Sequence, residues 1–168
     1  MKLILLGILV AATACIGTET RDVGRLRDAI DHSRVTIHDM VAVAEASMAD
    51  GRAVSAELVL DGTAVYSYGT VGANTLMDVR VDTVEGNIVS TARVGSSSDS
   101  CTGSISLAEA IALAETEVPG GTVIAAIPDD DVHCAREIQV LDPTLLWEVK
   151  VAGDGQILEL EESDETED

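Results

Sequence analysis

The ten residues TIHDMVAVAE at Thr36–Glu45 return, nearly position by position, as SLAEAIALAE at Ser106–Glu115, an offset of 70 residues. The same offset relates MDVRV at Met77–Val81 to WEVKV at Trp147–Val151. An aliphatic-rich sequence can imitate one such block by chance, but not several blocks in the same order. We therefore interpret the chain as carrying a duplicated module.

Each copy opens with a segment that has the features of an amphipathic helix. Thr36 and Asp39, like Ser106 and Glu109, have the spacing of a capping box, in which a hydroxyl and a carboxylate bind the free amides of the first turn. Apolar residues then recur at intervals of three and four, which predicts one buried face. Gly51 ends the first helix, and a Pro-Gly-Gly sequence ends the second.

The stretches after each helix alternate between apolar and polar residues, which is the period of a β-strand. In the first copy the inward positions are expected to be Val54, Ala56, Leu58 and Leu60. The predicted fold class is α+β, with two tandem repeats at residues 33–94 and 104–162, each one helix packed on a three- or four-stranded antiparallel sheet. A Gly/Ser-rich linker is predicted over residues 95–103. Because each copy has only about 60 residues, the copies are expected to pack together.

The first residues have the features of an export signal, predicted over residues 1–14. Lys2 precedes an apolar run that ends in the small residues Ala12-Thr13-Ala14. That run is shorter than the roughly 20 residues of a membrane-spanning helix. The triplet fits ordinary signal cleavage, and it also resembles part of a bacterial lipobox because Cys15 follows it directly. The sequence thus leaves two alternatives: plain secretion, or lipid attachment at Cys15.

Lipid attachment would leave the protein in the periplasm, held to a membrane through its anchor. By resemblance to Gram-negative lipoproteins, Ile16 in place of an aspartate favours the outer membrane. Residues 15–32 are then expected to form a tether, in which Val23, Leu26 and Ile30 have the spacing of a short amphipathic turn.

The cysteine count agrees with lipidation. If Cys15 carries lipid, Cys101 and Cys134 remain as an even pair in an oxidising compartment, and we predict a disulfide between them. Two alternatives are a pair of buried thiols and a metal site that uses Cys134 and His133, but no further ligands lie at usable spacing. We predict no metal site and no cofactor.

The charge excludes nucleic acid as a partner. The chain has 10 Lys and Arg against 30 Asp and Glu, a net charge of −20, so it has no basic patch to bind phosphates. Residues 163–168 are predicted to be a solvated acidic tail. Asp129-Asp130-Asp131 is another acidic run, but it lacks the alternating ligands of a calcium loop.

Catalytic motifs are also missing from the sequence. It contains no H-E-x-x-H, G-x-S-x-G, P-loop or G-x-G-x-x-G pattern. The three histidines, His32, His38 and His133, lie far apart, and helical periodicity places His38 on the solvent side of its helix. We therefore predict that the protein is not an enzyme.

The end of each copy resembles the PepSY family, whose closing hairpin typically reads V-D-A-x-T-G-E-V-L. The residues that carry the resemblance are Val81, Asp82 and Gly86 in the first copy and Val151 and Gly155 in the second. The second copy departs from the pattern with Ala152 in place of the aspartate, so any role of that aspartate is not expected there.

The resemblance implies a non-catalytic module that inhibits or modulates an envelope or secreted peptidase. PepSY modules occur in propeptides of metallopeptidases and in many exported bacterial proteins. The implied mechanism is docking of an exposed strand or hairpin edge, with affinity from main-chain hydrogen bonds. The alternative is a non-inhibitory envelope scaffold or cation-binding lipoprotein, for which the acidic segments would be responsible.

Overall fold

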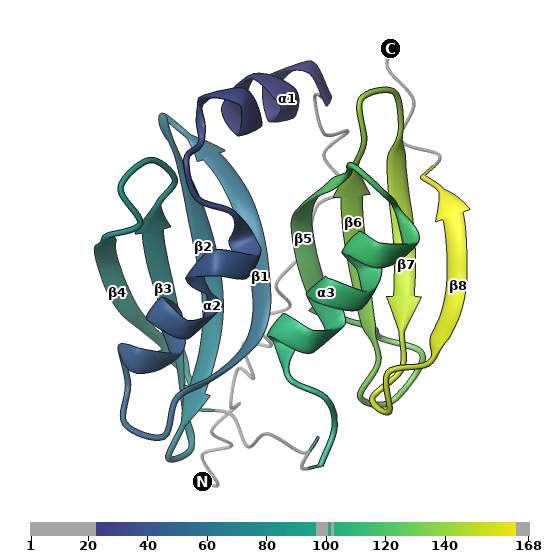
Figure 1. Cartoon of the computed structure of the whole chain (residues 1–168). Helices are drawn as coiled ribbons and strands as arrows, with labels where there is room; N and C mark the ends of the chain where they lie inside the picture. The colour runs from purple at the N-terminus through teal and green to yellow at the C-terminus, as the bar shows by residue number, and fades with distance from the viewer. Residues whose placement is uncertain (1–22, 97–100, 102, 164–168) are drawn as a thin grey trace, which may run out of the picture.

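A computed structural model describes residues 23–96, 101 and 103–163, which form three helices and one sheet of eight antiparallel strands (Figure 1). The helices are α1 (Val23–His32), α2 (Ile37–Ala46) and α3 (Leu107–Glu117). The strands are β1 (Arg52–Asp61), β2 (Thr63–Gly72), β3 (Thr75–Asp82), β4 (Ile88–Gly95), β5 (Thr122–Pro128), β6 (Arg136–Leu141), β7 (Leu146–Val151) and β8 (Ile157–Glu162). The predicted signal at 1–14, Cys15, most of the predicted linker and residues 164–168 lie outside the described residues.

The strand order is β4-β3-β2-β1-β5-β6-β7-β8, so both halves of the chain belong to one sheet. The joint is antiparallel pairing of β1 with β5, in which Ala56 lies opposite Ala126 and Glu57 opposite Ala125. The mixed helix-and-strand class is as predicted. The expectation of a separate sheet for each half is wrong, because the main-chain edges of β1 and β5 pair with each other and join the two halves into one sheet.

Helices α2 and α3 lie on the same face of this sheet (Figure 1). Both predicted capping boxes are present: the Thr36 hydroxyl accepts from the amide of Asp39, and the Ser106 hydroxyl accepts from that of Glu109. The apolar side of each helix is buried against the strands. Its fully buried members include Ile37 and Ala44 in α2 and Leu107, Ala110, Ile111 and Ala114 in α3.

His38 lies on the solvent side of α2 only in part. Its side chain is 37% exposed, and its Nδ1 lies 3.0 Å from Oε2 of Glu115 on α3. The two helices pack beside each other, and this brings the pair together.

The core is aliphatic apart from two tyrosines on β2. Tyr66 and Tyr68 are almost fully buried, and each hydroxyl donates to a main-chain carbonyl near the start of α2: to Val35 at 2.9 Å and to Ile37 at 2.7 Å. Burial of a tyrosine requires such a partner for its hydroxyl. Burial also raises the pKa of both phenols.

The simple alternation predicted for β1 is interrupted. A β-bulge between Ala53 and Ser55 shifts the register, so Ala53 and Ala56 are buried while Val54 is only partly so. A bulge inserts one residue and thereby reverses the inward side of the strand. Strand β5 has the same irregularity between Val123 and Ala125, at an offset of 70 residues.

The tether expected over residues 15–32 differs from the structure in its second half. Residues 23–32 form α1, and Val23 and Leu26 are buried, with 7% and 3% of their surface exposed. The apolar spacing noted in the sequence is thus the packed side of a helix. Within the described part of the chain, no helix is both long enough and apolar enough to cross a membrane.

Candidate docking surface and its supports

The hairpin that joins β3 to β4 contains the first set of motif residues. Oδ1 of Asp82 accepts hydrogen bonds from the amides of Val84 (2.9 Å) and Glu85 (2.7 Å), which shapes the turn. Gly86 has φ +70°, a conformation that favours glycine, and its amide donates to the carbonyl of Asp82. Val81 is fully buried just before the turn. These residues therefore build the hairpin and do not form a chemical site.

The hairpin that joins β7 to β8 forms a similar turn, although Ala152 replaces the aspartate. The amide of Ala152 donates to the carbonyl of Gln156 (2.8 Å), and the amide of Gly155 donates to the carbonyl of Ala152 (2.9 Å). Gly155 has φ +89°. Oδ1 of Asp154 accepts from the Gln156 amide at 3.1 Å. Val151, like its counterpart, is fully buried. A carboxylate thus supports this turn too, from a different position.

Both hairpins lie against the helix of their own half. A Cβ added to Gly86 would lie 2.8 Å from Sδ of Met40 on α2, and one added to Gly155 would lie 3.4 Å from Cδ1 of Leu113 on α3. The turn geometry that the two hairpins share therefore sets the distance between each edge hairpin and its helix.

The segments that enter α2 and α3 are fixed in equivalent ways. The amide of Val35 donates to the carbonyl of Thr83, and the amide of Ile105 donates to that of Gly153. The carbonyl of Val35 accepts from the hydroxyl of Tyr66, whereas that of Ile105 accepts from Nη1 of Arg136 at 3.4 Å. A tyrosine and an arginine, 70 residues apart, thus perform one structural task. Sequence comparison missed this pair because the side chains share no chemistry.

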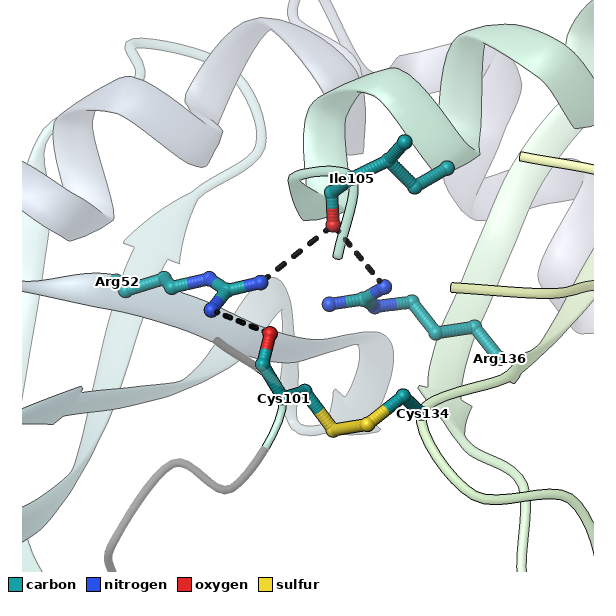
Figure 2. The surroundings of a disulfide bond; sticks show 5 residues. All are labelled: Arg52, Cys101, Ile105, Cys134 and Arg136. Atoms are coloured by element: carbon teal, nitrogen blue, oxygen red, sulfur yellow. Dashed lines mark hydrogen bonds between the residues drawn. A yellow bond between two sulfur atoms is a disulfide. The ribbon is translucent and has the colours of Figure 1, made fainter. Parts of the chain in front are cut away.

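The predicted disulfide between Cys101 and Cys134 is present, with a Cα–Cα distance of 5.4 Å (Figure 2). Arg52, at the start of β1, donates to the carbonyl of Cys101 at 3.3 Å and to that of Ile105 at 3.5 Å. The disulfide joins the segment before α3 to the loop before β6, and Arg52 joins the same segment to the first half. Together they brace the two halves at one end of the joint.

His133 lies close to the disulfide. Ligand atoms of Cys101, His133 and Cys134 lie within 4.8 Å of one another. Both sulfurs are joined in the disulfide, which leaves His133 as the free ligand of this group. The free-thiol alternative is therefore wrong for this structure.

Strands β4 and β8 form the two edges of the sheet, and both are largely exposed. On β4, Val89 and Val94 are 56% and 64% exposed, and each lies at a register shift against β3. On β8, Leu158 lies at a register shift against β7 and is 44% exposed. Edge strands present unpaired main-chain groups to which another extended segment can add.

The edges differ in charge. Strand β4 contains one basic residue, Arg93, and no acidic one, whereas β8 contains Glu159, Glu161 and Glu162. Charged residues on an edge discourage unwanted strand pairing. The charges on β8 therefore protect that edge against unwanted strand pairing, whereas β4 is the more apolar edge.

The acidic residues of β7 and β8 continue onto the face of the sheet that α2 and α3 leave open. Burial, followed by the charges of Glu137 and Glu161, raises the pKa of Glu148. Nearby, Nζ of Lys150 lies 3.0 Å from Oδ2 of Asp129 and 3.5 Å from Oε2 of Glu159. Burial of the Asp129 side chain, which is 4% exposed, is the largest effect on its pKa and raises it. The hydrogen bond and charge of Lys150, together with the hydrogen bonds from the amides of Val132 and Asp131, outweigh burial and lower the pKa of Asp129. One aspartate of the acidic run is thus an ion-pair partner, which its sequence did not reveal.

The turn between β6 and β7 is organised by another carboxylate. Oδ1 of Asp142 accepts from the amides of Leu145 and Thr144 and from the Thr144 hydroxyl, while Oδ2 accepts from Nε1 of Trp147 at 2.8 Å. The amide of Leu145 and the indole of Trp147 contribute most to holding the pKa of Asp142 well below its usual range. Both carboxylate oxygens of Asp142 thus accept hydrogen bonds within the turn or from the strand that follows it.

The histidines occupy three separate elements. His32 ends α1, His38 lies in α2, and His133 lies in the loop between β5 and β6. The histidine contacts found in the described residues are His32 with Asp28 and His38 with Glu115.

Comparison with known proteins finds a family match for part of the chain. Residues 104–161 match the model of the family described as PepSY, "Peptidase propeptide and YPEB domain". Among solved structures, the chain is similar to a protein of Clostridium difficile 630 described as "a putative lipoprotein", with 18% identity, a TM-score of 0.46, and coverage of 78% of this chain and 95% of the other. No curated protein matches the sequence. The match to the PepSY model thus spans α3 and β5–β8, in the second half of the chain.

Proposed function

We propose that the chain is a non-catalytic exported binding module that inhibits or modulates an envelope or secreted peptidase. The observation that carries the proposal is the PepSY domain at residues 104–161, because the description of that family joins it to peptidase propeptides. A propeptide acts by contacting its enzyme, so a surface suited to docking is the feature to look for.

The first half of the chain, residues 33–94, is on this proposal a second PepSY-like copy. Equivalent capping boxes, at Thr36 and Ser106, and equivalent bulges, in β1 and β5, support this. The two paired contacts of Val35 and Ile105 support it further, because unrelated sequences would have no reason to place the same hydrogen bonds 70 residues apart. Tandem copies give the module two hairpins and two sheet edges.

Docking is proposed to occur by addition of an extended peptidase segment to an exposed edge strand. Main-chain hydrogen bonds give affinity in this mode, and side chains at alternate positions give specificity. The exposed aliphatic residues at the edges, Val89 and Val94 on β4 and Leu158 and Leu160 on β8, offer such side chains. The helix-covered face contributes rigidity.

Lipid attachment at Cys15 is proposed to hold the module at the periplasmic side of the outer membrane, with plain secretion as the alternative. Residues 15–22 would then connect the anchor to α1.

The test uses the purified chain from Ile16 onward as bait for an extract of the envelope of the cells that produce it. Retained fractions are assayed for peptidase activity, and the activity is titrated with the bait. The expected result is a stoichiometric fall in the activity of one peptidase. Retention of no peptidase, or of one whose activity does not change on titration, would overturn the proposal.

Two double variants separate the edges in the same titration. Val89→Lys with Val94→Lys adds charge to β4, and Leu158→Lys with Leu160→Lys adds the same charge to β8 at residues that are also more than 40% exposed. Lysine at an exposed edge opposes strand addition without removing a buried group. The edge that docks is the one whose variant loses inhibition, and the other variant is its matched control. Full inhibition by both variants would exclude edge docking.

A second candidate, a cation-binding envelope protein, is favoured by the crowding of Glu137, Glu148 and Glu161 on the open face. Divalent cations with oxygen ligands would relieve that repulsion. The test is the melting temperature with and without calcium at low salt. A rise that the variant Glu148→Gln abolishes is expected on this candidate, and an unchanged melting temperature would dismiss it.

A further inference from the structure

Cys101, His133 and Cys134 lie together where the segment before α3 meets the loop before β6; Figure 2 shows the two cysteines. A ring nitrogen of His133 and the two sulfurs all lie within 4.8 Å of one another. In the described part of the chain, no other group of three histidine, cysteine or carboxylate side chains is close enough to share a metal ion. The sequence pairs His133 only with its neighbour Cys134, and the fold adds Cys101 as a third ligand.

Two thiolates and one imidazole are a ligand set typical of zinc. Zinc binds a thiolate sulfur at about 2.3 Å and an imidazole nitrogen at about 2.0–2.1 Å, so ligand atoms around a tetrahedral zinc ion lie about 3.5–3.8 Å apart. The limit of 4.8 Å within this group is close to that spacing. The two sulfurs are bonded in the disulfide, so they would have to separate before they could hold a metal ion.

The main chain of Cys101 is held by contacts that do not involve its sulfur. Its carbonyl accepts hydrogen bonds from Nη1 of Arg52 at 3.3 Å and from the amide of Ser104 at 3.1 Å (Figure 2). Breaking the disulfide would therefore leave Cys101 facing Cys134, with their Cα atoms 5.4 Å apart. Rotation about the Cα–Cβ bonds can then separate the sulfurs without movement of the main chain.

The loop that contains His133 and Cys134 is also shaped without help from the disulfide. Oδ1 of Asp129 accepts a hydrogen bond from the amide of Val132, and the amide of Ala135 donates to the carbonyl of Val132 at 3.0 Å. These two bonds lie on either side of His133 and Cys134 in the sequence. They therefore hold both ligands near their present positions when the disulfide is broken.

This group is open to solvent. His133 is exposed, and Cys101 and Cys134 are partly exposed. A disulfide in such a position is within reach of a thiol reductant, and a zinc ion there could take water as its fourth ligand. Asp130 and Asp131, just before His133, are exposed and acidic, which favours the approach of a cation.

We propose that Cys101, Cys134 and His133 form a zinc site when the disulfide is reduced. The reductant is a dithiol: its two thiols give two electrons and two protons and become a disulfide, while the bond between Cys101 and Cys134 breaks and each sulfur becomes a thiol. Zinc then displaces the two thiol protons, and the neutral imidazole of His133 supplies the third ligand. The disulfide and the zinc ion exclude each other. This site uses neither edge strand, so it does not depend on peptidase docking.

The test uses the chain from Ile16 onward, which keeps two of the three cysteines. The disulfide is reduced with a phosphine, which is then removed in the absence of air. Cobalt(II) is the probe, because it takes tetrahedral zinc sites and its bonds to thiolate absorb strongly in the near ultraviolet. We expect one cobalt ion per reduced chain with this absorption, and its displacement by zinc. The oxidised chain is expected to show no such absorption.

Variants of the reduced chain test each ligand. His133→Gln is expected to weaken zinc binding at least tenfold, and Cys101→Ser is expected to weaken it more and to reduce the thiolate absorption of the cobalt form. His32→Gln is the matched control, because His32 is an exposed histidine on another element, α1. It is expected to change zinc binding less than twofold.

The melting temperature provides a second readout. Zinc is expected to raise the melting temperature of the reduced chain more than that of the oxidised chain, because a ligand stabilises the form that binds it. If reduction loosens the fold, zinc is expected to restore it.

Three results would overturn the proposal. The first is a reduced chain that shows no thiolate absorption with cobalt and that zinc does not stabilise. The second is His133→Gln binding zinc as tightly as the unsubstituted chain. The third is equal affinity of the oxidised and reduced chains for zinc, because the ion would then lie away from the cysteines, as on the acidic open face of the sheet.

Discussion

Replacing both cysteines of the disulfide by serine, Cys101→Ser with Cys134→Ser, should destabilise the fold substantially. The bridge joins residues separated by 33 positions. In the chain-entropy account, a closed loop of that length removes unfolded-state freedom worth roughly 4 kcal/mol at 25 °C. For a chain of 168 residues, that loss corresponds to a fall in melting temperature of roughly 8–15 °C.

The assay is thermal and urea unfolding, followed by circular dichroism, of the original and the double-serine chains with and without a reducing agent. The reducing agent should lower the stability of the original chain to that of the serine variant and leave the serine variant unchanged. If the serine variant lost less than about 1 kcal/mol, the Arg52 contacts with the carbonyls of Cys101 and Ile105 would be sufficient to fix the segment, and the loop argument would be refuted.

Three further changes test the fold that supports the hairpins and the helices. Gly86→Ala should lower the free energy of unfolding by about 1–2 kcal/mol, because the backbone at Gly86 is left-handed. The loss should exceed that of Gly62→Ala, because an added methyl group at Gly86 would lie 2.8 Å from a methionine sulfur, whereas Gly62 has open space. Equal losses in urea unfolding would refute the role of this contact. Tyr68→Phe leaves the ring in place but removes the hydrogen bond to Ile37, and it should cost about 1 kcal/mol in the same assay, with no loss meaning that the bond is dispensable. The pKa of Asp142 is lower in the folded state than its ordinary value of 3.8, so its stabilising effect is complete above about pH 4 and is lost as the pH falls further. Asp142→Asn should therefore flatten the acid side of the stability curve, and an unchanged acid side would contradict this assignment.

The features of the fold that depend on local sequence could be predicted. The capping box and the three-and-four spacing determine where a helix begins and which side it buries, and α2 and α3 begin as expected. The pairing of Cys101 with Cys134 followed from counting cysteines in a chain predicted to be exported. The family match for residues 104–161 agrees with the resemblance seen in the closing hairpin.

Features that depend on distant residues could not be predicted in this way. The joint between β1 and β5 has no local signal, because a strand that pairs on one side has the same alternation as one that pairs on both. The bulge at Ala53 reverses the inward side without any glycine or proline to announce it. The ion pair of Asp129 with Lys150 depends on β7 passing the loop after β5, which the acidic run alone cannot reveal.

The joint between β1 and β5 also has a mechanical consequence. Its register pairs only Ala56 with Ala126 and Glu57 with Ala125, whereas β1 pairs with β2 along nearly its whole length. If one force pulled on β4 and an opposite force pulled on β8, the load would act on every pair of neighbouring strands in turn. The hydrogen bonds between β1 and β5 would break first, because that pairing is the shortest. The hydrogen bond from Arg52 to Cys101 and the pair of His38 with Glu115 also join the two halves and would help to hold this joint together. Under such a load, the two halves of the sheet would rotate relative to each other at the joint while each half stays folded, and the edge strands would not detach first.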